Sequence, residues 1–236
     1  MIKNGTHKLS INGTLEDFFT NMKTFILDVT DFQLIQDECD IFKLSFNTNI
    51  NNVKMVIKDA NITSSADTTT TSFAINFSFY QGNNLLDSFN QNYTTSPISQ
   101  SAIADRIINL FVYVTTNVKF FDFSATTSTF GYTFGKVITS EIATKSTKNR
   151  FFIRNIFYPF DGIGTKLYLL NIFYGHQCGS GIVKNNLLLT ESPSTPTNIT
   201  EYCTDLYNCS AVTSKYKYTI NGEMYFAIDR NIIVRI

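Results

Sequence analysis

The spacing of apolar residues changes once near the start of the chain, and this change restricts the fold more than any other feature. Between Thr14 and about Val29, apolar residues recur every three or four positions, as on the buried stripe of an α-helix. The stripe consists of Leu15, Phe18, Phe19, Met22, Phe25, Ile26 and Val29. We therefore predict a helix over about 14–29, with Phe18 and Phe25 in the core or at a subunit interface.

From Asp31 onward, most apolar residues alternate with polar ones, as they do in half-buried β-strands. The first alternating runs are 32–35, 41–46, 53–57 and 73–79. The segments between them are rich in Asn, Asp and Gly, which favour turns because they tolerate unusual backbone angles. This pattern predicts an antiparallel sheet against which the first helix packs.

A second helix is predicted over about 97–115. Ser96 is a favourable N-cap, and Pro97 suits the first helical position, where its missing N–H removes no hydrogen bond. Apolar residues then recur at helical spacing at Ile98, Ala102, Ile103, Ile107, Leu110, Phe111 and Val114. Residues 1–140 are therefore expected to form an α+β domain, in which an antiparallel sheet carries two packed helices.

The polar stretch 141–149 separates this part from a second one. Two runs rich in aromatic and β-branched residues, 151–158 and 167–174, are typical of sandwich strands. An Asn-Gly dipeptide at 221–222 lies between two alternating runs, which is a strong hairpin signal. We predict a β-sandwich-like domain over 150–236, so that the whole chain is α+β but rich in β-structure.

Charge and hydropathy exclude some classes of function. Nineteen basic and nineteen acidic side chains cancel, so no excess positive charge favours specific binding to nucleic acid or to an anionic membrane. No stretch approaches the roughly 18 consecutive apolar residues of a membrane span. The first ten residues lack the apolar segment of a secretory signal. We expect neither nucleic acid nor a membrane among the partners.

The charges are unevenly divided along the chain. Residues 1–118 hold 7 basic and 11 acidic side chains, and residues 119–236 hold 12 and 8. This division is either statistical drift or a sign that the two ends attract each other in neighbouring copies, since complementary potentials steer association. A basic cluster occurs at Lys145, Lys148, Arg150 and Arg154. It could contact nucleic acid or a neighbour's acidic face, although a solvated face is the simpler interpretation.

Candidate catalytic residues are few. The chain has two histidines, His7 and His176, and no Gly-x-Ser-x-Gly segment of the kind that presents a nucleophilic serine. Residues 161–166 resemble a phosphate-binding loop that ends in Lys, but they lack its spacing and are better explained as a turn. We therefore predict no enzymatic activity, no catalytic residues and no cofactor.

The cysteines leave three alternatives open. His176, Cys178, Cys203 and Cys209 have the ligand types of a closed zinc site, but most zinc modules pair their cysteines at two- to four-residue spacing. The other interpretations are reduced thiols, or a disulfide that includes Cys178 or joins Cys203 to Cys209. We expect that folding needs no bound metal.

Three segments resemble small structural proteins of tailed bacteriophages from low-GC hosts. These segments are 12–19, 154–161 and 218–226. The resemblance implies a virion protein of the tail, the baseplate or the head-to-tail neck, made in the host cytoplasm. It also implies assembly in several copies with neighbouring virion structural proteins as partners, and no catalytic residues.

A receptor- or glycan-binding module is the alternative function. The expected β-sandwich would carry polar loops at 124–129 and 191–200. Tyr202 and Tyr207, if exposed at loop tips, would stack on sugars, because a tyrosine ring offers an apolar face with a polar end.

Overall fold

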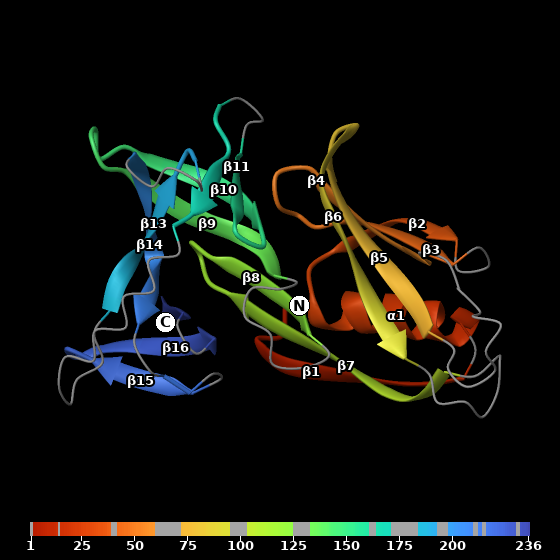
Figure 1. The fold of residues 1–236 in the computed structure, drawn as a ribbon. Coiled ribbons are helices and arrows are strands. Elements are labelled where there is room, and N and C mark those ends of the chain that lie inside the picture. Colours follow the sequence, from red (N-terminus) through yellow and green to blue (C-terminus); the bar gives the residue numbers. More distant parts are fainter. Residues whose placement is uncertain are drawn as a thin grey trace. The chain divides into compact units, whose positions relative to one another are not determined.

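The chain folds into two compact units that consist mainly of β-strands (Figure 1). The computed structural model describes residues 2–13, 15–38, 42–59, 72–94, 103–124, 133–160, 164–170, 184–192, 198–209, 212–213, 216–229 and 232–236. The first unit comprises Met1–Val112 and Asp122–Thr126, and the second comprises Tyr113–Phe121 and Thr127–Ile236. The polar stretch 141–149 lies in the second unit, where it joins two strands of a hairpin.

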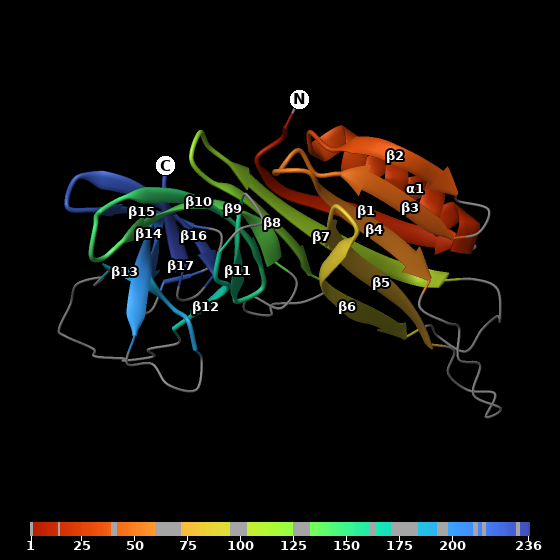
Figure 2. The same cartoon turned by 90° about the horizontal axis from the view of Figure 1, so that it is seen from above.

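The first unit contains a helix and a five-stranded antiparallel sheet. Helix α1 spans Leu15–Val29, so the helix predicted over about 14–29 is present. The sheet has the strands in chain order: β2 (Gln33–Glu38), β3 (Lys43–Asn47), β4 (Val53–Asp59), β5 (Ser72–Gln81) and β6 (Asn84–Thr94). Figure 2 shows α1 close to the sheet strands β2 and β3, and it also packs against β1 (Gly5–Gly13).

The second predicted helix, over about 97–115, is wrong. Its described part is strand β7 (Ile103–Val114), which pairs antiparallel with β1 from Gly5↔Val112 to Gly13↔Ile103. Five of the twelve residues of β7 are Ile or Val, and β-branched side chains favour a strand once a partner strand is available. The apolar spacing fitted a helix, but β1 supplies that partner from almost 100 residues away. Residues 95–102, which include the expected helix start, lie outside the described residues.

Phenylalanine rings fill the core of the first unit. Phe18 and Phe19 of α1 are fully buried and meet edge to face at 5.3 Å between ring centroids. Phe77 of β5 stacks on Phe89 of β6 at 5.2 Å. Phe25 is only partly buried, because it lies at the margin of the buried stripe of α1.

The second unit contains a closed six-stranded barrel, so the predicted sandwich is wrong. The strands are β9 (Thr133–Glu141), β10 (Thr147–Ile153), β11 (Ile156–Pro159), β12 (Leu167–Leu169), β13 (Lys184–Thr190) and β14 (Ile199–Cys209). Each pairs antiparallel with the next, and β14 also pairs with β9. The local pattern indicated strands over 151–158 and 167–174 but none over β14. Closure depends on the β9–β14 pairing across some sixty residues, which alternation alone does not specify.

The barrel is filled by side chains. Strand alternation and the pairing registers place on one face of all six strands Val137, Thr139, Arg150, Phe152, Phe157, Leu167, Leu189, Glu201 and Cys203. None of these residues is more than 4% exposed. Phe152 stacks on Phe157 at 5.6 Å within this set. A barrel of this size has room for side chains only.

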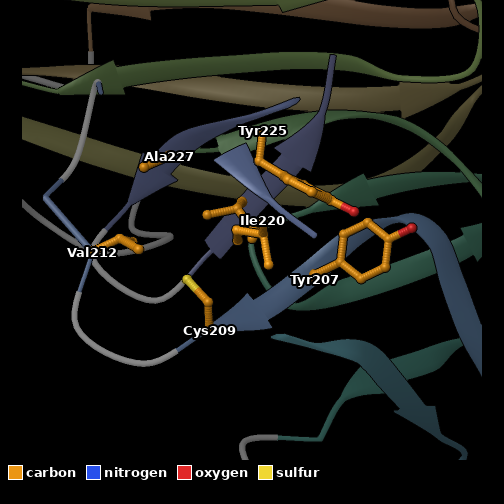
Figure 3. Close-up of a cluster of buried hydrophobic side chains, with 7 residues drawn as sticks. Tyr207, Cys209, Val212, Ile220, Tyr225 and Ala227 are labelled. Atoms are coloured by element: carbon orange, nitrogen blue, oxygen red, sulfur yellow. The ribbon is translucent and has the colours of Figure 1, made fainter. Parts of the chain in front are cut away.

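Besides the last residues of β7, four more strands belong partly or wholly to the second unit. They are β8 (Lys119–Ser124), β15 (Lys217–Ile220), β16 (Glu223–Asp229) and β17 (Ile232–Arg235). The Asn-Gly turn at 221–222 has positive φ at both residues and joins β15 to β16, so the predicted hairpin is confirmed. Strand β17 pairs with β14. A buried cluster that includes Tyr207, Cys209, Ile220 and Tyr225 packs beneath this hairpin (Figure 3).

Candidate functional site

A buried ion pair crosses the line where the barrel closes. Arg150 on β10 and Glu201 on β14 have side chains that are only 5% and 3% exposed. The Arg150 Nε donates to Glu201 Oε2 at 2.9 Å, and Nη2 donates to Oε1 at 2.5 Å. Thr139 on β9 donates its hydroxyl to the same Oε2 at 2.6 Å. The three strands β10, β9 and β14 are thus joined by side chains as well as by backbone hydrogen bonds.

The remaining Arg150 nitrogen is also bonded. Nη1 donates to the Thr165 carbonyl at 2.9 Å, so the guanidinium spans the barrel interior and reaches the segment that leads into β12. A buried ion pair is tolerated only when further hydrogen bonds satisfy both groups. The arrangement meets this condition, because both carboxylate oxygens and three guanidinium nitrogens have partners.

A second, more exposed group of polar side chains lies beside the ion pair. Lys148 Nζ forms an ion pair with Glu141 and lies 3.8 Å from Glu201 Oε1. Glu141 also accepts hydrogen bonds from Thr144 and from Ser146, the latter at 2.8 Å. The hydrogen bond from Lys148, followed by those from Thr144 and Ser146, lowers the pKa of Glu141 to about 2. Glu141 is therefore held as an anion near neutral pH.

These contacts fasten a short seam. Strands β9 and β14 pair through Thr139↔Cys203, Ser140↔Tyr202 and Glu141↔Glu201, and one further bond runs from Ile142 N to the Thr200 carbonyl at 2.9 Å. So few backbone bonds give the seam little strength of its own. We call Thr139, Lys148, Arg150 and Glu201 the seam cluster. Together with Glu141, its charged members neutralise one another, which suits a role in holding the fold.

The basic cluster of the sequence is a solvated face only in part, because Lys145 and Lys148 are exposed whereas Arg150 is buried. Arg150 is buried in the barrel, and Lys148 belongs to the seam cluster. Lys145 Nζ lies over the Tyr202 ring at 6.0 Å from its centroid, a distance at which the cation is attracted to the ring. The sequence did carry a signal for Arg150, because it directly precedes the apolar run of Phe151 to Ile153 on the same strand.

The described cysteines agree with the reduced-thiol alternative and not with a bond between them. Cys203 and Cys209 are buried free thiols on the single strand β14. Six residues of extended strand separate their Cα atoms by roughly 20 Å, whereas a disulfide needs less than about 7 Å. The Cys203–Cys209 disulfide is therefore wrong, and the two sulfurs cannot bind one zinc ion.

His176, Cys178 and Cys39 lie outside the described residues. Within the described ranges, no three His, Cys, Asp or Glu side chains gather as metal ligands would. Burial raises the pKa of the Cys203 thiol, which makes it a poor nucleophile, because the thiolate is the reactive form.

The tyrosines proposed to stack on sugars are not at loop tips. Both belong to strand β14. Tyr207 is buried against Tyr225, with ring centroids 5.6 Å apart, and its hydroxyl donates to the Thr204 carbonyl at 2.7 Å. Tyr202 is partly buried beneath Lys145. This correction removes the residues on which the glycan-binding alternative relied.

Several large apolar side chains remain on the surface. In the second unit they include Tyr216, Met224 and Ile236, which are 63%, 47% and 40% exposed. Ile236 N donates to the Met224 carbonyl at 3.0 Å, so these two residues are cross-strand neighbours. In the first unit Ile35 and Leu85 are 57% and 54% exposed. Exposed apolar groups that lie together mark contact surfaces more often than isolated ones do.

Within the part of the chain that is described, no helix has the length and apolar character needed to cross a membrane. Comparisons of the chain with protein families, with curated proteins and with solved structures found no match.

Proposed function

We propose that this chain is a structural protein that works by binding copies of itself and neighbouring structural proteins in the particle of a tailed bacteriophage. The observation that carries the proposal is the apolar surface on the hairpin of β16 and β17. Met224 and Ile236 lie opposite each other there and are both exposed. Apolar groups in this arrangement lose contact with water when a partner covers them, which is the main source of free energy in most associations.

The exposed pair continues a packed layer. Phe226 lies two residues beyond Met224 on the same face of β16, and Val234 lies opposite it on β17. Phe226 stacks on Tyr113 with ring centroids 5.7 Å apart and rings nearly parallel, at 2°. The packing of Phe226 therefore fixes the strands that carry Met224 and Ile236. Preorganised apolar anchors contribute strongly to the affinity of interfaces.

The resemblance to phage structural proteins supports a contact at the same place in the fold. Of the three resembling segments, 218–226 forms most of the hairpin that carries Met224. Segment 154–161 includes the turn between β10 and β11, and segment 12–19 includes the first residues of α1. A glycan-binding function is not proposed as a second candidate, because Tyr207 is buried.

Co-sedimentation of the purified chain with particles of the encoding phage that lack it tests this proposal. We expect binding that falls only modestly between low and physiological salt, since apolar burial is the main contribution and charge mainly sets orientation. A phosphate-contacting protein would instead lose orders of magnitude in affinity. Absence of the chain from wild-type particles, together with turnover of a substrate, would overturn the proposal.

Met224→Glu should reduce this binding at least about tenfold, because it places a charge in the covered surface. Ile142→Glu is the matched control, since Ile142 is 38% exposed in the β9–β10 turn of the same unit. We expect the control to bind like the wild type. Equal loss in both variants would show that the hairpin of β16 and β17 is not the contact surface.

A further inference from the structure

Four described strands pair with a neighbour on one side only, and three of them carry features that discourage pairing with another chain. These edge strands are β1, β2, β6 and β15. Strand β2 has a bulge between Leu34 and Gln36, and its Asp37 and Glu38 form ion pairs with lysines. Bulges and charges are the usual protection of a sheet edge.

Strands β15 and β1 are protected in similar ways. Strand β15 is four residues long and begins with Lys217. Strand β1 carries Lys8 and has an irregularity in its register between Ile11 and Gly13. Short length, lysine and broken register each reduce the chance that a further strand adds to the edge.

Strand β6 lacks this protection. It has eleven residues, contains no proline, and has Asp87 as its single charged residue. Its register with β5 shifts only beside the turn, between Phe79 and Tyr80. From Asp87 to Thr94 the pairing with β5 is regular. A long and nearly uncharged edge that is regular from Asp87 to Thr94 can pair over that stretch with another strand.

The side chains hold β6 in place for such pairing. Phe89 is 4% exposed and packs on Phe77 and Phe79, with centroids at 5.2 and 6.1 Å. On the other face, Asn90 accepts a hydrogen bond of 2.7 Å from the side-chain amide of Asn76. Ser88 is exposed on the same face as Asn90. Strand β6 is therefore anchored in the core on one face by Phe89. On the other face, Ser88 and Asn90 are both uncharged.

We propose that β6 binds a second copy of this chain, by antiparallel pairing of β6 with β6 of the partner about Phe89. Phe89 is the middle residue of 84–94, and this register pairs the regular residues 87–91 of the two copies with each other. It places Asp87 opposite Gln91 and Ser88 opposite Asn90 of the other copy. The single charge therefore does not face its own copy, so no like charges oppose each other in this contact. A two-fold contact of this kind uses the same surface on both copies.

This inference rests on the proposed assembly function and specifies the contact. The test uses two double variants, Ser88→Lys with Asn90→Lys and Ser88→Glu with Asn90→Glu. In the proposed register each variant alone places like charges opposite each other at both positions, and like charges opposite each other destabilise strand pairing. A mixture of the two variants places opposite charges there instead. Gln33→Lys with Gln36→Lys on the exposed positions of β2 is the control with the same added charge.

Sedimentation velocity over a concentration series measures self-association. We expect each β6 variant alone to associate at least about tenfold more weakly than the wild type, and the mixture to recover. The β2 control should match the wild type. If the lysine variant fails to fold, as judged by thermal melting, Gln91→Glu alone places Glu opposite Asp87 of the other copy and leaves the Asn76–Asn90 bond intact.

Three outcomes would overturn the β6 contact. Self-association that neither β6 variant weakens would place the contact elsewhere, while the assembly function would stand. Equal weakening by the β2 control would show a general effect of charge. A wild-type chain that joins the phage particle but stays monomeric would assign the β6 edge to a different protein.

Discussion

The two units of this chain bury different kinds of side chain. In the first unit, the face of α1 that packs inward is apolar throughout and includes Phe18, Phe19, Met22 and Ile26. In the second unit, the barrel interior contains the Arg150–Glu201 pair among apolar side chains. An apolar face can pack in more than one register, but a buried ion pair tolerates few arrangements, because a displaced partner leaves a charge unpaired.

This difference teaches what each unit needs for a unique structure. The helix of the first unit has a broad apolar stripe that finds its place by burial. The barrel of the second unit closes through a seam of three residue pairs between β9 and β14, and the seam cluster fixes their register. The following changes, taken from the largest expected effect to the smallest, test the comparison.

Glu201→Gln should destabilise the second unit by about 3–5 kcal/mol, because it leaves the buried Arg150 cation without its counter-charge. Urea unfolding followed by circular dichroism measures the change in the free energy of unfolding. The double variant Arg150→Met with Glu201→Leu should recover most of the loss, since an apolar pair of similar size needs no partner. A double variant that is as unstable as Glu201→Gln would contradict this interpretation.

Phe18→Ala should destabilise the first unit by about 3 kcal/mol, because it removes a fully buried ring from a closely packed core. Phe25→Ala should cost clearly less, since Phe25 is only partly buried. Thermal unfolding of both variants measures the difference. Equal losses would mean that Phe25 is covered as completely as Phe18, for example by a second copy of the chain.

Glu141→Gln should change the pH dependence of stability rather than stability at low pH. The pKa of Glu141 is about 2, below its ordinary value of 4.5, so the folded state binds this proton less readily than the unfolded state. The contribution is present above about pH 4.5 and is lost as the pH falls toward 2. The variant should therefore show a flatter stability profile across that window in acid unfolding. The effect is the smallest of the three because the carboxylate is partly exposed and is screened by water.

The sequence predicted elements that depend on neighbours along the chain. The stripe of α1 and the Asn-Gly hairpin at 221–222 are both local signals, and both elements are present. Strand β7 was predicted as a helix because its apolar spacing fits either structure. Whether this segment forms a helix or a strand depends on pairing with β1, which lies almost 100 residues earlier in the chain.

The seam cluster was missed for the same reason. Arg150 and Glu201 are 51 residues apart, and nothing in the local pattern indicates that the two side chains meet. Their burial follows from barrel closure, which the alternating pattern does not specify. Tyr207 was expected at a loop tip because no strand was predicted over 199–209, but it belongs to the long strand β14.

Sedimentation velocity of the purified wild-type chain over a wide range of concentrations tests assembly most directly. We predict that the weight-average sedimentation coefficient rises with concentration, as self-association through apolar and edge-strand contacts requires. A single monomeric boundary at every concentration, with no binding to the phage particle, would contradict the proposed role as an assembling structural protein.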